Sequence, residues 1–426
     1  MKLLLQKVSI LSPGSQHHMK VKDVLINDSI IEKIAEPNTI VNKDSVVIKA
    51  DHLYVSSGWM DLHVNFRTPG HEYKEGLKNG CAAAANGGFT TVLLMPSTLP
   101  TISNRSSVEL IINTTKSNAV NVYPAGSMTV DMNGNDMSEM YDMYLAGAKA
   151  FTDDKKSVSN AGLLIRSLQY SQQFGGKIFL FAEDESISGK HQINDGPISV
   201  SIGLKGQPNI AEEVMIIRDL TVGEFCHCPI HFSTISTAGS VSLIRTAKAK
   251  GIKVTCDVSV MHLFFNDTTL ESFDTTFKIR PPLRSEADRI ALLEGLKDGT
   301  IDCITSDHQP EDSENKLKEF ELAAYGASTI DTTFSAARKA TEKYLSLPEL
   351  VSKFTTHPRC IVGLKNHLIE EGQIADLTIF DAEEKWNVKA TDIISKSKYN
   401  PFIDHDLLGR VIGIYNTAQL VKSKRD

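Results

Sequence analysis

The sequence contains no run of about 18 apolar residues, so none of its 426 residues is predicted to form a transmembrane helix. Basic residues are not in excess: the formal net charge is −7, which argues against general nucleic-acid binding. No signal-peptide cleavage pattern follows the short apolar start at residues 1–10. These absences predict a cytoplasmic protein whose partners are neither membranes nor nucleic acids.

Cysteine is also scarce, with six residues scattered along the chain. This number and spacing do not indicate a disulfide framework, and a reducing compartment is expected. Cys226 and Cys228 flank His227 and could bind a metal, but no second pair completes a four-ligand site. We therefore favour the interpretation that they are ordinary thiols.

A glycine-rich G-x-G-x-x-G motif is missing after the first strand, which disfavours a dinucleotide-binding, doubly wound sheet. From residue 58 onward, short apolar β-branched runs alternate with helical patterns over about 300 residues, which predicts a parallel (β/α)8 TIM-type barrel. The expected strands include 90–95, 120–125, 148–152, 177–181, 229–232, 253–258 and 300–305, and the expected helices include 73–86, 211–224, 240–250 and 286–297.

The two ends of the chain have a different, β-rich pattern. Short strands separated by turns are expected at 2–11, 20–27, 29–35 and 45–50, and again after residue 372. We predict that residues 1–57 and 358–426 form one composite β-sandwich domain beside a barrel domain at residues 58–357.

Active sites of such barrels lie at the C-terminal ends of the strands, and polar residues cluster at these positions. His63 and Asn65 are two residues apart, so on an extended strand both side chains point the same way. A pair of histidines in this arrangement is a common metal-binding pair, but here the second position is asparagine. The other candidates are Arg67, Ser97, Asp153, Asp154, Glu183, Asp184, His231, Thr234, His262, Asp307 and His308.

Several longer motifs carry a resemblance to a known family. They are Phe-Arg-Thr-Pro-Gly at 66–70, Gly-Gly-Phe-Thr-Thr-Val at 87–92, Ser-Thr-Ala at 236–238, Lys-Ile-Arg-Pro-Pro-Leu-Arg at 278–284 and Ser-Asp-His at 306–308. Over nearly its whole length the chain resembles the dihydroorotases of the amidohydrolase superfamily, specifically the longer type with a flanking β-sandwich. The resemblance implies zinc-dependent opening of the cyclic amide of dihydroorotate, or its closure from carbamoyl-aspartate, in pyrimidine biosynthesis.

Some residues that the family uses are retained. His63, Asp154 and Asp307 match metal positions, and Asp307 also matches the aspartate that carries the proton. The adjacent Asp153 is the alternative to Asp154 as the bridging carboxylate. Arg67 matches the arginine that binds the substrate carboxylate.

Other family residues are replaced. Asn65, Phe181 and Thr234 stand where metal-binding histidines are expected, so a second zinc would have no protein nitrogen ligand. At substrate-binding positions, Ser97 and Arg280 replace asparagines, and Glu311 replaces a histidine. The loop from Glu311 to Gly326 is charged and is expected either to face solvent or to contact a partner.

Two interpretations follow from this pattern. The first is a non-catalytic dihydroorotase-like protein with either no cofactor or one weakly bound divalent metal. Non-catalytic members of the family imply aspartate transcarbamoylase as a partner. A homodimer is also expected. Whether a small anionic ligand binds at Arg67 is left open by the sequence. The alternative is an active dihydroorotase or related cyclic amidohydrolase with a single-zinc site. If no metal binds, the retained residues are expected to pair with Lys155, Arg280 or His308.

Overall fold

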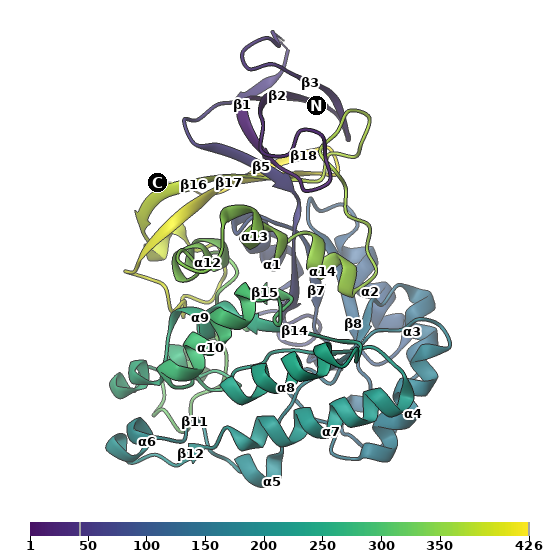
Figure 1. The fold of residues 1–426 in the computed structure, drawn as a ribbon, viewed down its shortest axis with the longest axis vertical. Coiled ribbons are helices and arrows are strands. Elements are labelled where there is room, and N and C mark those ends of the chain that lie inside the picture. Colours follow the sequence, from purple (N-terminus) through teal and green to yellow (C-terminus); the bar gives the residue numbers. More distant parts are fainter. Residues whose placement is uncertain (42–43, 425–426) are drawn as a thin grey trace.

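A parallel eight-stranded barrel forms the larger part of this computed structural model, which describes residues 1–41 and 44–424. The barrel closes between its first and last strands, where Val64 bridges His308 and the Asn65 amide donates to the His308 carbonyl at 2.8 Å. This topology confirms the predicted TIM-type barrel (Figure 1). Its strands, in order, are β6 (Trp59–Val64), β7 (Phe89–Leu94), β8 (Asn121–Gly126), β9 (Ala150–Phe151), β10 (Ile178–Leu180), β13 (Ile230–Phe232), β14 (Val254–Ser259) and β15 (Cys303–Thr305).

Helices surround these strands. The structure places them at α1 (Leu77–Asn86), α2 (Arg105–Thr115), α3 (Met140–Ala146), α4 (Ala161–Gln172), α5 (Glu185–Ser188), α6 (Pro197–Ile202), α7 (Ile210–Cys226), α8 (Ala238–Ala249), α9 (Val260–Phe264), α10 (Glu286–Lys297), α11 (Ser313–Lys316), α12 (Thr333–Ala340), α13 (Leu347–Ser352) and α14 (Thr356–Ile361). Side-chain caps fix several helix starts; for example, the Ser285 hydroxyl accepts from the Asp288 amide at the start of α10. The helix predicted from residue 73 begins only at Leu77, because Gly76 with φ 86° interrupts the chain.

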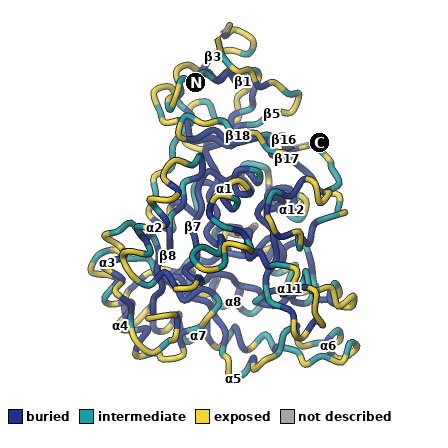
Figure 2. The backbone as a smooth tube through the Cα atoms, turned by 180° about the vertical axis from the view of Figure 1, so that it is seen from behind, coloured by how far each residue is buried: buried dark blue, intermediate teal, exposed yellow. Residues whose placement is uncertain are grey.

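Apolar strand residues explain the core. Every residue of β6 and β7 is buried, as expected for strands covered on both sides. Inside the barrel, Met60, Leu62, Leu93 and Met95 pack together, while a larger apolar cluster fills the layer between strands and helices. Figure 2 shows this buried interior against exposed loops and helix surfaces.

The two chain ends pair in one mixed sheet, with its own apolar core. Its strands are β1 (Lys2–Leu11), β2 (Val21–Asn27), β3 (Ile30–Ala35), β4 (Val46–Ile48), β5 (Leu53–Ser57), β16 (Leu377–Asn387), β17 (Asp406–Asn416) and β18 (Gln419–Lys422). The predicted association of N- and C-terminal β segments is thus confirmed. A small parallel pair, β11 (Ile193–Asn194) and β12 (Gly206–Gln207), lies apart from both sheets.

Gly58 alone separates the terminal sheet from the barrel. A Cβ atom at this position would collide with the Asp376 carboxylate and the Thr90 hydroxyl. Asp376 is fixed there by Arg359, whose Nη2 lies 2.8 Å from its Oδ2. The chain therefore needs glycine where it passes beneath this buried ion pair. Within residues 1–41 and 44–424, no helix combines the length and apolar character needed to cross a bilayer.

Candidate active site at the C-terminal end of the barrel

The strand ends bring the sequence-predicted residues to one buried region. His63 lies on β6 and Asn65 directly after it, Asp154 follows β9, and Asp307 follows β15. Phe181 comes immediately after β10, and Thr234 follows β13. All six side chains are buried. The barrel topology thus explains why residues more than 200 positions apart meet.

His63 and the two aspartates form the centre of this region. His63 Nε2 lies 2.8 Å from Asp154 Oδ1 and 3.5 Å from Asp307 Oδ1, while its Nδ1 contacts Ser233 Oγ at 3.0 Å. The other Asp154 oxygen accepts hydrogen bonds from Ser97 Oγ and, at 3.4 Å, from Asn65 Nδ2. Of the two candidate bridging carboxylates, it is therefore Asp154 that joins this group. Asp153 instead accepts from the Thr129 hydroxyl and the Met128 and Thr129 amides.

Lys155 supplies a positive charge to the same group. Its Nζ lies 2.9 Å from Asp307 Oδ1, which matches one of the expected non-metal pairings. Burial and Lys155 disfavour protonation of His63, but Asp154 and Asp307 outweigh them and raise the His63 pKa above its ordinary value. Burial alone would raise the pKa of Asp154, yet His63 and Lys155 hold it well below its usual range. The two carboxylates therefore share the side chains of His63 and Lys155 as their nearest basic partners.

Phe181 has two cations near the face of its ring. Lys155 Nζ and Arg280 Cζ each lie 5.5 Å from the ring centroid, within the range of cation–π attraction. Arg280 also makes a two-point contact with Glu183, at 2.9 and 2.7 Å. Arg280 therefore pairs with Glu183 and not with the retained metal-position aspartates.

The neighbouring histidines, His231 and His308, form hydrogen bonds with groups other than Asp154 and Asp307. His231 contacts Asp257 Oδ2 through Nε2 at 3.0 Å and Thr255 Oγ1 through Nδ1 at 2.9 Å. His308 Nδ1 accepts from the Thr329 amide at 3.2 Å, and burial together with Arg67 lowers the pKa of His308 to about 3. A neutral His308 cannot neutralise Asp307, so the alternative pairing with His308 is not the one observed.

Arg67 is held by a carboxylate of the chain. Its Nη2 lies 2.9 Å from Glu311 Oε1, and its Nε donates to the Pro310 carbonyl at 3.2 Å. Lys74 Nζ contacts the other Glu311 oxygen at 2.6 Å. The Glu311 side chain is only 5 % exposed. Glu311 thus sits between two cations, in the position that an anionic ligand of Arg67 would need.

The residues present do not match a pair of zinc ions. Phe181 has no donor atom, and Asn65 and Thr234 offer only oxygens where imidazole nitrogens are expected. Within the described residues, no group of three or more His, Cys, Asp or Glu side chains is arranged to hold a metal ion. His63 Nε2 and Asp154 Oδ1 lie 2.8 Å apart without a hydrogen bond of acceptable geometry.

The charged loop at 311–326 only partly faces solvent, so that expectation was wrong for two of its charged residues. Glu311 is buried between Arg67 and Lys74. Lys316 is 1 % exposed, and its Nζ donates to the carbonyls of Ala324 and Gly326 at 3.0 and 2.7 Å. Burial lowers the pKa of Lys316 to about 7. Charge pattern alone could not reveal these tertiary partners.

Three contributors were not singled out from the sequence: Lys74, Ser233 and Asp257. Lys74 lies in a segment expected to be helical, with no pattern pointing to Glu311. Ser233 lies between His231 and Thr234, and only those two neighbours were considered as candidate ligand positions. Asp257 lies within β14, and a lone acid inside an apolar strand is a signal that the sequence does offer.

Comparison with known proteins agrees with the architecture. Residues 53–240 match the Dihydro-orotase-like family profile. The chain is 40% identical over 386 residues to a dihydroorotase of Ruminiclostridium cellulolyticum, covering 90% of both chains. It is 37% identical over 423 residues to a dihydroorotase of Citrifermentans bemidjiense, covering 99% of both.

Among solved structures, an L-hydantoinase (dihydropyrimidinase) from Arthrobacter aurescens shares the fold. Its TM-score is 0.83 at 24% identity, covering 100% of this chain and 96% of that one. This likeness shows the same fold, a barrel with a terminal sheet. The length and identity of the sequence matches go further: the chain belongs to the dihydroorotase family.

Proposed function

We propose that this chain is a non-catalytic member of the dihydroorotase family that serves pyrimidine biosynthesis as a structural subunit in the cytoplasm. One observation supports this proposal above all: the cations at the barrel mouth are paired with carboxylates of the chain itself. Lys155 and His63 are paired with Asp307 and Asp154, Arg280 with Glu183, and Arg67 with Lys74 around Glu311.

These ion pairs oppose two requirements of the family reaction, which are zinc binding and binding of the anionic substrate. Zinc at His63, Asp154 and Asp307 would have to compete with Lys155 for Asp307. An anionic substrate at Arg67 would have to displace Glu311, whose charge repels it. Each lost electrostatic contribution typically costs about two to three orders of magnitude in rate. Loss of both together supports an inactive barrel.

Metal content and turnover test the proposal directly. The protein is purified with zinc supplied, its bound zinc is measured by elemental analysis, and hydrolysis of dihydroorotate is followed. We expect less than one equivalent of zinc and no turnover above that of a control preparation. Two equivalents of zinc together with turnover would overturn the proposal.

A restoration series tests whether the replaced residues are the cause. Asn65→His, Phe181→His and Thr234→His are introduced together, with and without Lys155→Met. We expect tighter zinc binding when Lys155 is also removed, because its ammonium then no longer holds Asp307. Equal zinc binding in the two restored variants would contradict the role assigned to Lys155.

The assembly part of the proposal rests on family membership. Aspartate transcarbamoylase is the proposed partner, and the chain itself is proposed to form a homodimer. Co-purification of the two chains and sedimentation of their mixture test the first point. Separate migration at every ratio would contradict it.

A second candidate is an amidohydrolase with one metal ion. Its support is the close approach of three retained side chains, with His63 Nε2 at 2.8 Å from Asp154 Oδ1 and 3.5 Å from Asp307 Oδ1. Retained His63, Asp154 and Asp307 would hold the ion, and Asp307 would carry the proton. One tightly bound equivalent of zinc with cyclic-amide hydrolysis would favour this candidate.

A further inference from the structure

A cavity of about 370 Å³ lies beside the barrel mouth. It adjoins the Arg67–Glu311 ion pair, because Glu311 and its second partner Lys74 both belong to its walls. Three segments form these walls: the loop after β6, the loop after β15 and the segment that precedes β17. The volume lies within the range of about 300–1,000 Å³ that is usual for pockets of small organic ligands.

Three lysines, Lys74, Lys396 and Lys398, line this cavity. Lys396 Nζ donates to the Glu72 carbonyl at 2.8 Å, so its side chain reaches from its own segment to the loop after β6. Lys398 Nζ donates to two backbone carbonyls of its own segment, at 2.7 and 3.0 Å. Carbonyls are neutral, so these contacts cancel neither positive charge. Because an ammonium has three N–H donors, Lys396 and Lys398 each keep at least one for a ligand.

The two carboxylates of the cavity are directed to donors of the protein itself. The oxygens of Glu311 contact the two cations described above. Asp312 accepts hydrogen bonds from the Asn315 backbone amide at 2.9 Å and from the Asn315 side-chain amide at 3.0 Å. Lys396 and Lys398 are thus left in excess, and a concave site with excess positive charge attracts anions.

Two tyrosines, Tyr73 and Tyr399, also line the cavity. Tyr73 is 62% exposed, and its ring makes an edge contact with the His71 ring at a centroid distance of 6.1 Å. Lys74 Nζ lies 5.9 Å from the Tyr73 ring centroid. Tyrosine offers a flat apolar face, on which a nucleobase can stack whatever its sequence identity. The cavity therefore combines surfaces for a flat ring with ammonium groups for an anion.

We propose that this cavity binds a phosphate monoester that carries a flat aromatic ring, that is, a nucleoside monophosphate. Lys396 and Lys398 would contact the phosphate, and the base would stack on the exposed face of Tyr73. The Ser313 and Ser397 hydroxyl groups, which also line the cavity, are further donors for the ligand. This inference goes beyond the proposed structural role, and it does not depend on zinc binding or on loss of catalysis.

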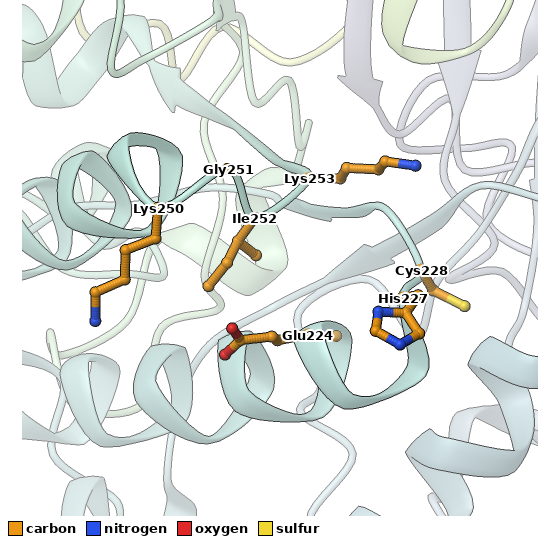
Figure 3. Close-up of a pocket in the computed structure, with 8 residues that line it drawn as sticks. Glu224, His227, Cys228, Lys250, Gly251, Ile252 and Lys253 are labelled. Carbon is orange, nitrogen blue, oxygen red and sulfur yellow. The ribbon is translucent and has the colours of Figure 1, made fainter.

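A second cavity of the chain has a different composition and provides a comparison. Figure 3 shows it between the ends of α7 and α8, and its volume is about 280 Å³. It is also lined by two lysines, Lys250 and Lys253, but their side chains extend in different directions and Glu224 lies in the same lining. The ring in this lining is that of His227 in place of a tyrosine. Lys253→Ala is therefore a matched control for loss of one lysine beside a cavity.

Isothermal titration calorimetry of the whole chain with AMP tests the site, with phosphate and adenosine as partial ligands. We expect AMP to bind with a dissociation constant below about 1 mM, and phosphate and adenosine to bind about ten-fold more weakly or less, because each lacks half of the ligand. Added sodium chloride should weaken AMP binding by screening the lysines. Absence of AMP binding at about 5 mM, or equal affinities for AMP and phosphate, would overturn the proposal.

Single substitutions assign the binding to this cavity. Lys396→Ala and Lys398→Ala should each weaken the binding of AMP about ten-fold or more, because each removes a charged hydrogen-bond donor. Tyr73→Ala should weaken AMP about five-fold or more without changing the affinity for phosphate. All three residues are exposed, so folding should be kept, which the thermal midpoints check. Unchanged AMP affinity in Lys396→Ala, or an equal loss in the control Lys253→Ala, would overturn the site.

Discussion

Removal of the Glu311 carboxylate is expected to leave two buried cations without a partner. Arg67, Lys74 and Glu311 have side chains only 12 %, 11 % and 5 % exposed, so solvent would compensate little of the lost charge. Breaking a buried ion pair by removing one partner costs about 3–5 kcal/mol. We expect Glu311→Ala to destabilise the protein by about this amount, and Glu311→Gln by less, because its amide oxygen still accepts one hydrogen bond.

Acetate should then restore part of the stability of Glu311→Ala. The space left by the side chain lies between two cations that already contact both carboxylate oxygens, at 2.9 and 2.6 Å. With an acetate dissociation constant of about 10 mM, about 100 mM acetate would restore about 1.4 kcal/mol by mass action. The measurement is the apparent thermal midpoint in sodium acetate against sodium chloride at equal ionic strength.

The exposed Glu314, in the same loop, provides the matched control. Glu314→Ala is expected to change stability by less than about 0.5 kcal/mol and to respond to acetate like the wild type. If Glu311→Ala were as stable as the wild type, or if chloride restored it as well as acetate, the ion-pair reasoning would be refuted. In that case Arg67 and Lys74 would have to be satisfied by other groups.

Three further predictions concern metal binding, backbone packing and pH. Lys155→Met should tighten binding of zinc near His63 relative to the wild type, measured by competition with a metal indicator, since Asp307 loses its ammonium partner. Gly58→Ala should destabilise by about 1–3 kcal/mol because its Cβ meets Asp376 and Thr90, whereas the exposed helical Gly162→Ala should not destabilise; chemical denaturation compares them. Burial raises the pKa of Glu75 to about 7, so the stability it contributes when protonated is present at low pH and lost as pH rises through 7. Wild type should therefore lose on the order of 1 kcal/mol relative to Glu75→Gln between pH 6 and 8, and a pH-independent difference would contradict this.

Much of the fold was predictable because it depends on local patterns. The run Glu286–Lys297 carries its own cap in Ser285 and forms the predicted helix with the same limits. Strand–helix alternation predicted the barrel, and the β pattern of both termini predicted their joint sheet. Boundaries shifted where a single residue dominates the backbone, as at Gly76, which delays the start of α1.

The position of the candidate site was predictable from the sequence, but the ion pairs between its charged side chains were not. Barrel topology fixes which strand ends meet, so the meeting of His63, Asp154 and Asp307 followed from the sequence. The choice of partner for each charge depends on side-chain reach across the barrel, as between Arg67 and Glu311, which are 244 residues apart. Sequence spacing contains no information on that contact.

Retained metal-position residues are therefore weak support for a retained metal in this chain. A buried carboxylate without a cation is costly, so Asp154 and Asp307 need positive charge whether or not a metal is bound. Here His63 and Lys155 lie beside them, and Glu311 supplies the matching negative charge to Arg67 and Lys74. Such mutual compensation stabilises these charged residues in a barrel that has asparagine, phenylalanine and threonine at 65, 181 and 234. For the proposed inactive barrel, we expect zinc binding to require removal of the compensating charges, Lys155 and Glu311, as well as histidines at 65, 181 and 234.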